Sequence, residues 1–93
     1  MDYFLERAKL YQQQSQQALS YLSQGETNLA NLLLKNLKRS YISEMNNMND
    51  KKHDFYDVLV EVNSFLASDL DEVTQLEYMR NKFREYVLAH ESN

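Results

Sequence analysis

Apolar residues recur along this chain at spacings of three and four residues, the period that places side chains on one face of an α-helix. The first such seam runs through residues 2–23, and its positions are Phe4, Ala8, Tyr11, Ser15, Ala18 and Leu22. Gly25 is the only glycine of the chain, and a glycine directly after an apolar seam is typical of a helix C-terminus. We therefore expect a helix over about 2–23, with the run QQQSQQ at 12–17 on its solvated face.

A second seam begins after the glycine, and Thr27 is the expected N-cap of its helix. The apolar positions of this seam are Leu29, Ala30, Leu33, Leu34, Leu37, Tyr41, Met45 and Met48. Lys35, Lys38 and Arg39 lie mainly outside this face, and cations on a polar helix face are usually solvated. The pattern predicts a helix over about 27–47 that forms a hairpin with the first.

The most polar stretch near the middle of the chain, NNMNDKKHDFYD at 46–57, allows two interpretations. Asparagine and aspartate are weak helix formers and good caps, so a turn with Asn49 or Asp50 as N-cap would start a third helix over about 50–67. One continuous helix from about 28 to 67 is the alternative, because an apolar seam with a spacing of seven passes through the stretch without losing phase. That seam consists of Leu34, Tyr41, Met48, Phe55 and Val62.

The last helix has a clearer start. Ser68 and Asp71 match the S-x-x-D form of a capping box, and Glu72 adds negative charge near a helix N-terminus. The seam that follows predicts a helix over about 69–90 that buries Val73, Leu76, Met79, Phe83, Tyr86 and Val87. Because short connections favour antiparallel neighbours, we expect one all-α domain over residues 1–93, a small antiparallel helical bundle of three to four helices.

Composition narrows the range of functions. A net charge of −4 and a pI near 5.0 argue against binding to nucleic acid or anionic membranes, which requires clustered cations. No apolar run approaches the roughly 18 residues needed to span a bilayer, so we expect a soluble, cytoplasmic protein. The chain has no cysteine, no glycine-rich phosphate loop and no G-x-S-x-G turn. We therefore expect a protein that is not an enzyme and that uses no cofactor.

Carboxylates cluster at the start of the third predicted helix. If this helix begins near Asp50, helical spacing places four carboxylates in one narrow stripe, namely Asp50, Asp54, Asp57 and Glu61. His53 and Asp57, at i and i+4, could both reach one metal ion, but we expect a solvated face and no metal site. His90, near the C-terminus, is expected to interact with its own helix end. Contact of the stripe with a basic protein surface is the functional interpretation that we favour.

Tyrosine offers a second indication of protein contacts, because it combines an apolar face with a polar tip and is enriched in the cores of interfaces. The chain has seven tyrosines, and Tyr21, Tyr56 and Tyr78 fall at the edges or backs of their helices. Ordinary boundary packing is the equally weighted alternative. The predicted partner-binding residues are Asp50, Asp54, Tyr56, Asp57, Glu61, Tyr21 and Tyr78.

Two functional hypotheses follow from these observations. The first is a small regulatory or protective protein, such as an inhibitor, an immunity factor or a dedicated chaperone, that binds one partner protein. In size and fold class the chain is similar to bacteriocin immunity proteins, a likeness that transfers no residues. The second is a self-assembling or secretion-linked helical hairpin that forms a homodimer or a larger bundle through its long seam. The helical hairpins exported by bacterial type VII systems have a similar size, but their W-x-G turn cannot occur in a chain without tryptophan.

Overall fold

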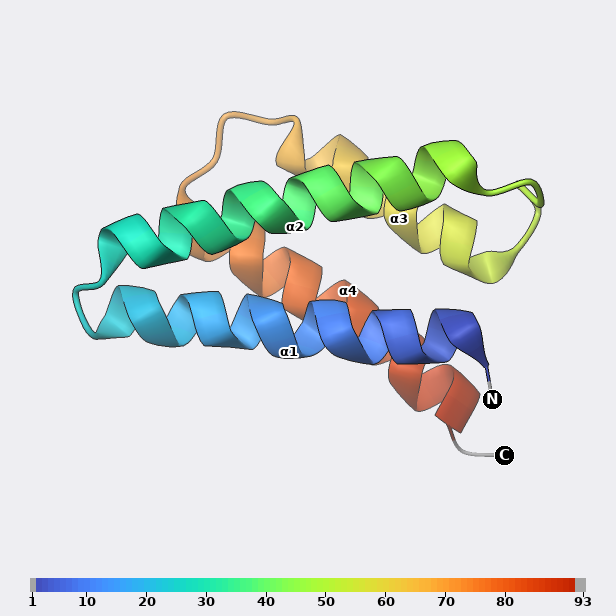
Figure 1. Cartoon of the computed structure of the whole chain (residues 1–93), viewed down its shortest axis with the longest axis horizontal. Coiled ribbons are helices and arrows are strands. Elements are labelled where there is room, and N and C mark those ends of the chain that lie inside the picture. The colour runs from blue at the N-terminus through green and yellow to red at the C-terminus, as the bar shows by residue number, and fades with distance from the viewer. Residues whose placement is uncertain (1, 92–93) are drawn as a thin grey trace.

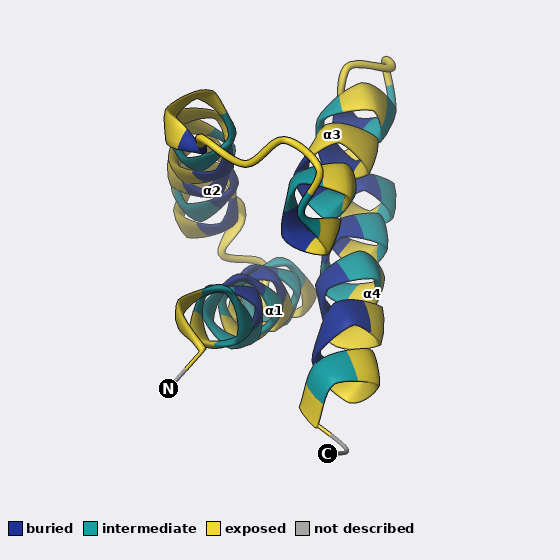
Figure 2. Ribbon diagram, turned by 90° about the vertical axis from the view of Figure 1, so that its right-hand side faces the viewer, coloured by how far each residue is buried: buried dark blue, intermediate teal, exposed yellow. Residues whose placement is uncertain are grey.

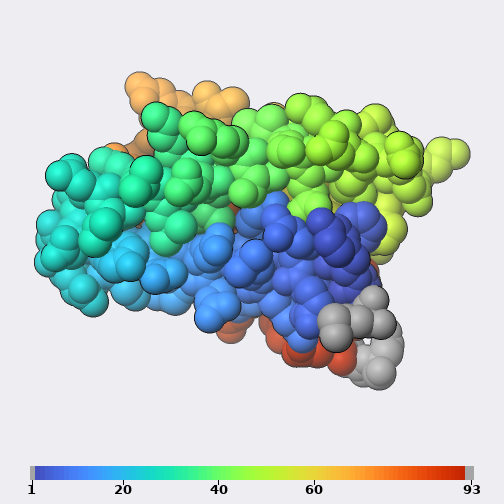
Figure 3. Space-filling view, in the orientation of Figure 1, coloured from blue at the N-terminus to red at the C-terminus, as the bar shows by residue number. Residues whose placement is uncertain are grey.

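The computed structural model describes residues 2–91 and confirms an all-α bundle of four helices in this part of the chain. The helices are α1 (Tyr3–Ser23), α2 (Thr27–Asn47), α3 (Asp54–Leu66) and α4 (Glu72–Glu91). They alternate in direction, with α1 and α2 as one antiparallel pair and α3 and α4 behind them (Figure 1). In the space-filling view, α1 and α2 cover the face turned to the viewer (Figure 3).

Local capping explains both ends of α1. The Asp2 carboxylate accepts hydrogen bonds from the backbone N–H groups of Phe4 and Leu5 at 3.0 and 3.2 Å, which satisfies two amides that have no partner within the helix. At the other end Gly25 has a φ of +77°, a conformation that residues with a side chain rarely adopt. The N–H of Glu26 then donates to the carbonyl of Tyr21 at 2.8 Å, as in a Schellman motif. The predicted glycine stop is confirmed, but Thr27 is the first residue of α2 and not its N-cap.

The structure separates α2 from α3. Residues 48–53 lie outside the helices, and the N-cap of α3 is His53, whose Nδ1 accepts a hydrogen bond from the N–H of Phe55 at 3.0 Å. The expected helix start near Asp50 is therefore wrong. The carboxylate of Asp50 instead accepts from the N–H of Lys52 at 3.0 Å, which stabilises the turn.

A continuous helix from 28 to 67 is also excluded by size. At 1.5 Å per residue it would be about 60 Å long, whereas the longest dimension of the molecule is 38 Å. Met48 explains why the apolar seam stayed in phase. Its backbone is extended, with φ −74° and ψ 128°, yet its side chain is buried in the core.

The start of α4 also differs from the prediction. The carboxylate of Asp71 accepts a hydrogen bond from the N–H of Thr74 at 2.8 Å, and hydrogen bonding to Thr74 lowers the pKa of this carboxyl group. Asp71 thus caps a helix that begins at Glu72, three residues later than expected. Ser68 remains in the α3–α4 connection, where its carbonyl accepts from the N–H of Leu70.

One core lies between the four helices, and Figure 2 shows the buried stripe that each helix turns toward it. On α1 the buried positions include the small residues Ala8, Ser15 and Ala18, which let a neighbouring helix approach closely. Val73 and Leu29 were expected in the core but are 45% and 46% exposed. Both lie in the first turn of a helix, at the margin of the bundle. None of the described helices is both long enough and apolar enough to cross a membrane.

Candidate partner-binding surface

Three of the predicted carboxylates share one side of α3. Asp54, Asp57 and Glu61 are all exposed, and their spacing of three and four residues aligns them along the helix. We call these three residues the acidic face. They lie away from the buried stripe of α3, which consists of Phe55, Leu59, Val62 and Leu66. Helical spacing therefore predicted the alignment of these three carboxylates correctly.

Helix α4 supplies two partners to the acidic face. Glu61 forms an ion pair with Lys82 at 2.8 Å, and the Asp54 carboxylate lies 3.4 Å from Nε2 of His90. Asp57 forms no hydrogen bond or ion pair among the side chains of residues 2–91. The Asp54 side chain remains 74% exposed. The acidic face thus presents carboxylate oxygens to solvent, above all those of Asp54 and Asp57.

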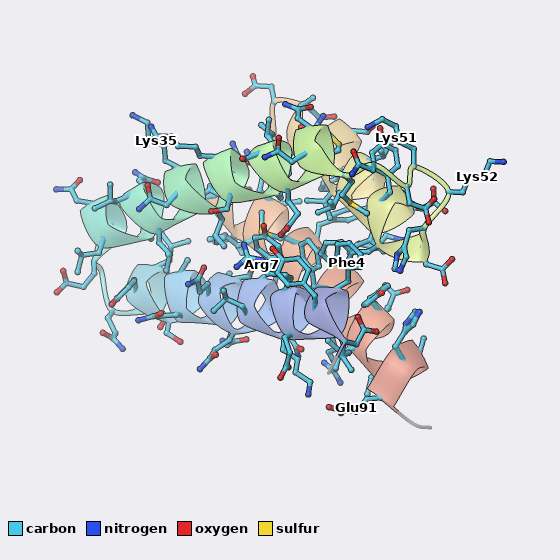
Figure 4. All side chains as sticks on the ribbon, turned by 45° about the vertical axis from the view of Figure 1, so that its right-hand side comes forward. Phe4, Arg7, Lys35, Lys51, Lys52 and Glu91 are labelled. Atoms are coloured by element: carbon cyan, nitrogen blue, oxygen red, sulfur yellow. The ribbon has the colours of Figure 1, made fainter. Side chains whose placement is uncertain are left out.

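Asp50, by contrast, is not a member of this row, because it lies in the turn four residues before the start of α3. The two residues that follow it are lysines. The ammonium group of Lys51 donates to the carbonyl of Met48 at 3.2 Å, and Lys52 extends away from the bundle (Figure 4). The negatively charged acidic face is therefore bordered, in the turn that precedes α3, by the positive charges of Lys51 and Lys52.

The three candidate tyrosines occupy different surroundings. Tyr78 stacks on Phe65 of α3, with ring centroids 3.7 Å apart and an interplanar angle of 2°. The Lys82 ammonium lies 5.8 Å from the centroid of the same ring, so Tyr78 borders the acidic face near Glu61. Tyr56 is half-buried, and the Lys51 ammonium lies 4.8 Å from its ring centroid.

Tyr21 is remote from Asp54 and Tyr56, because the C-terminal part of α1 and the start of α3 lie at opposite ends of the bundle (Figure 1). It lines a small hollow together with α2 side chains that include Leu29 and Leu32. Those two leucines are 46% and 56% exposed. The predicted set of seven residues is therefore not one site but an acidic face bordered by Tyr78 and a separate apolar hollow at Tyr21.

The two histidines have structural contacts. The Nδ1 atom of His53 is occupied by the cap of α3, and its ring packs on Phe4 with centroids 4.6 Å apart. His90 lies in the last turn of α4, and its Nδ1 is 2.8 Å from the carbonyl oxygen of Tyr86, a contact within its own helix but one turn before the helix end where it was expected. Among residues 2–91, no group of three or more metal-ligating side chains is arranged to hold an ion.

A polar network between α1 and α2 was not anticipated from the sequence. One Glu44 carboxylate oxygen accepts hydrogen bonds from Nε of Arg7 at 2.7 Å and from the Tyr11 hydroxyl at 3.1 Å. The other accepts from the Tyr3 hydroxyl at 2.8 Å. Partial burial opposes the charge of Arg7, but hydrogen bonds to Glu44 and Tyr11 outweigh it and raise the pKa of the guanidinium group. Tyr11 follows Arg7 by four residues, so helical spacing could have predicted this contact. The pairing of Arg7 with Glu44 spans 37 residues and could not be predicted in this way.

Replacing Glu44 with glutamine is expected to lower the free energy of unfolding by about 1.5–3 kcal/mol, because hydrogen bonds to a charged group are lost at a site that is only 11% exposed. Urea denaturation followed by circular dichroism measures the change. Glu77→Gln is the matched control, since Glu77 is exposed and forms no ion pair among residues 2–91. Equal stability of the two variants would mean that the network does not hold α1 and α2 together.

Comparison with known proteins adds no relative to this picture. No protein-family model, no curated protein and no solved structure matches the chain.

Proposed function

We propose that this chain acts without catalysis, by binding another protein through the acidic face of α3, in the manner of an inhibitor, an immunity factor or a dedicated chaperone. The observation that carries the proposal is the row formed by Asp54, Asp57 and Glu61. Its carboxylates remain exposed, and Asp57 has no partner among the side chains of residues 2–91. A partner with a basic surface would complete the ion pairs that the chain itself leaves incomplete.

The surroundings of the acidic face suit such a contact. The neighbouring α4 contributes Tyr78, whose ring is already fixed against Phe65, so that little side-chain entropy is lost when a partner packs on its edge. Opposite charges also accelerate encounter between proteins, and they do so less at high salt. We therefore expect association with the partner to be fast and to slow as the ionic strength rises.

Charge reversal tests the proposal. The triple variant Asp54→Lys, Asp57→Lys, Glu61→Lys is expected to weaken partner binding by a factor of about 100 or more, because close charge pairs across interfaces contribute several kcal/mol. The partner is first captured from the native host with the tagged wild-type protein, and its affinity for each variant is then measured by calorimetry. The helical circular dichroism should be retained, since these side chains lie outside the core and the contacts they lose, with Lys82 and His90, are on the surface.

The matched control reverses three exposed acids outside the acidic face, Glu26, Asp69 and Glu77. It changes the net charge by the same amount, so a purely non-specific charge effect would weaken binding equally in both variants. That result, or unaltered binding of the acidic-face variant, would show that the acidic face is not the partner-binding surface.

A second candidate function is self-association, and the hollow at Tyr21 is the observation that favours it. Leu29 and Leu32 are exposed beside the half-buried Leu33, and clustered apolar side chains on a surface often mark an interface. This form of self-association does not need the long seam of a continuous hairpin, which the break between α2 and α3 removes. Light scattering separates the candidates, because only this one requires the purified chain to be a dimer.

A further inference from the structure

A groove of about 580 Å³ lies between α1 and α4, on residues that neither the acidic face nor the apolar hollow includes. We call it the cationic groove, and its lining residues are Lys9, Gln12, Gln13, Gln16, Arg80 and Arg84. Helix α1 supplies the lysine and the three glutamines, and α4 supplies the two arginines. The glutamines belong to the QQQSQQ run, so this part of the run faces a concave surface. The volume falls within the range of small-molecule sites, about 300–1,000 Å³.

The two arginines keep uncompensated charge. Arg80 donates hydrogen bonds to the amide oxygens of Gln16 and Asn81 at 2.9 and 3.2 Å, and neither acceptor is charged. Arg84 forms no hydrogen bond or ion pair among the side chains of residues 2–91. Lys9 differs from them, because it pairs with Glu91 at 2.9 Å and approaches Glu6 at 3.6 Å. In a chain of net charge −4, two guanidinium groups in one groove therefore lack a carboxylate partner.

Their positions determine which ligand fits. Arg80 and Arg84 are four residues apart, so they project from the same side of α4 about 6 Å apart along its axis. The bond from Arg80 to Gln16 holds the first guanidinium group over α1. Each guanidinium group presents N–H donors in a fixed fork that matches the oxygens of a phosphate or a carboxylate. The glutamine amides can donate further hydrogen bonds.

We infer that the cationic groove binds a small molecule with two or more oxyanion groups, of which a diphosphate is the simplest. Two oxyanions would each engage one guanidinium group while the glutamine amides hold the remaining oxygens. A small ligand fits better than a nucleic acid, whose binding needs a longer row of cations along its backbone. The inference is independent of the proposed function, because it involves a different pair of helices.

The test is a titration of the full chain, ¹⁵N-labelled, with inorganic pyrophosphate and separately with citrate, at constant ionic strength. Saturable shifts are expected at the side-chain signals of the groove, with a dissociation constant of about 1 mM or tighter for at least one probe. Tighter binding of pyrophosphate would assign a phosphoryl ligand, and tighter binding of citrate would assign a polycarboxylate.

Two variants and one control give the test its specificity. Arg84→Gln should weaken binding by at least about tenfold, and the fold should not change, because Arg84 has no polar contact among the described side chains. Arg80→Gln together with Arg84→Gln should abolish saturation. The control combines Lys35→Gln with Arg39→Gln, two exposed cations at the same spacing on α2, and it should bind like the wild type.

Three results would overturn the inference. The first is the absence of saturation up to about 10 mM of either probe. The second is a response of Lys35 and Arg39 equal to that of Arg80 and Arg84, which would show general screening of surface charge. The third is binding of a single-stranded RNA oligonucleotide in the groove when neither small anion binds, which would replace the small ligand with a nucleic acid.

Discussion

Replacing Phe55 with alanine is expected to lower the free energy of unfolding by about 3–5 kcal/mol, a large part of the stability of so small a domain. Phe55 is fully buried on α3. Its ring stacks on Phe4 of α1 with centroids 5.0 Å apart and meets Tyr86 of α4 edge-on at 5.3 Å. Its loss would leave a cavity at the point where three helices meet, and large-to-small changes in such positions are the most costly.

Urea denaturation monitored by circular dichroism measures this effect. Val60→Ala is the matched control on the same helix, because Val60 is 38% exposed and alanine is the better helix former. We expect the control to change stability by less than about 0.5 kcal/mol. A loss of less than about 1 kcal/mol for Phe55→Ala would contradict the packing of α3 on α1 and α4.

A steep loss of stability is expected as the pH rises from about 10 to 12. Tyr11, Tyr41 and Tyr86 are all buried, and this burial raises the pKa of each hydroxyl to about 12. In the unfolded chain a tyrosine ionises near pH 10. Between these values the unfolded state releases protons that the folded state retains, so unfolding becomes more favourable as the pH rises. Below about pH 10 these groups make no pH-dependent contribution.

The expected size follows from the shift. Each tyrosine accounts for roughly 2–3 kcal/mol by pH 12, so the three together can unfold a domain of ordinary stability. Urea midpoints at a series of pH values measure the loss, and ultraviolet absorbance shows when the tyrosines ionise. Tyr41→Phe is the informative variant, because it should remove about a third of the decline. Constant stability up to pH 12, or ionisation of all seven tyrosines near pH 10 in the folded protein, would refute this expectation.

The hairpin of α1 and α2 could be predicted because its signals are local. A glycine at the end of an apolar seam determines where α1 stops, and the structure shows the required positive φ at Gly25. The polar stretch at 46–57 could not be decided in the same way. The spacing of apolar residues indicates which side chains are buried, not whether the backbone is helical. Met48 is buried although its backbone is extended, so the apolar spacing is kept through a stretch where the helix ends. His53 is also an unusual cap and gave no signal.

The candidate site was predictable only within one helix. Spacing correctly aligned Asp54, Asp57 and Glu61, because all three belong to α3. The prediction for Asp50 was wrong because it required α3 to begin near residue 50. The placement of Tyr21 with the acidic face was wrong because it required knowledge of how the helices are arranged. The Glu44 network and the cationic groove each join side chains of two helices. Their formation depends on long-range packing, which a single sequence does not reveal.

Site-specific photocrosslinking tests most directly whether a partner protein binds on the acidic face. A photoreactive residue is placed at Ser64, which is exposed three residues after Glu61 on α3, or at Asn31, which is exposed on α2. Each protein is irradiated in its native host. We predict one abundant adduct with a different protein from position 64 and none from position 31. An adduct from position 31 alone, or an adduct of the chain only with itself, would contradict it.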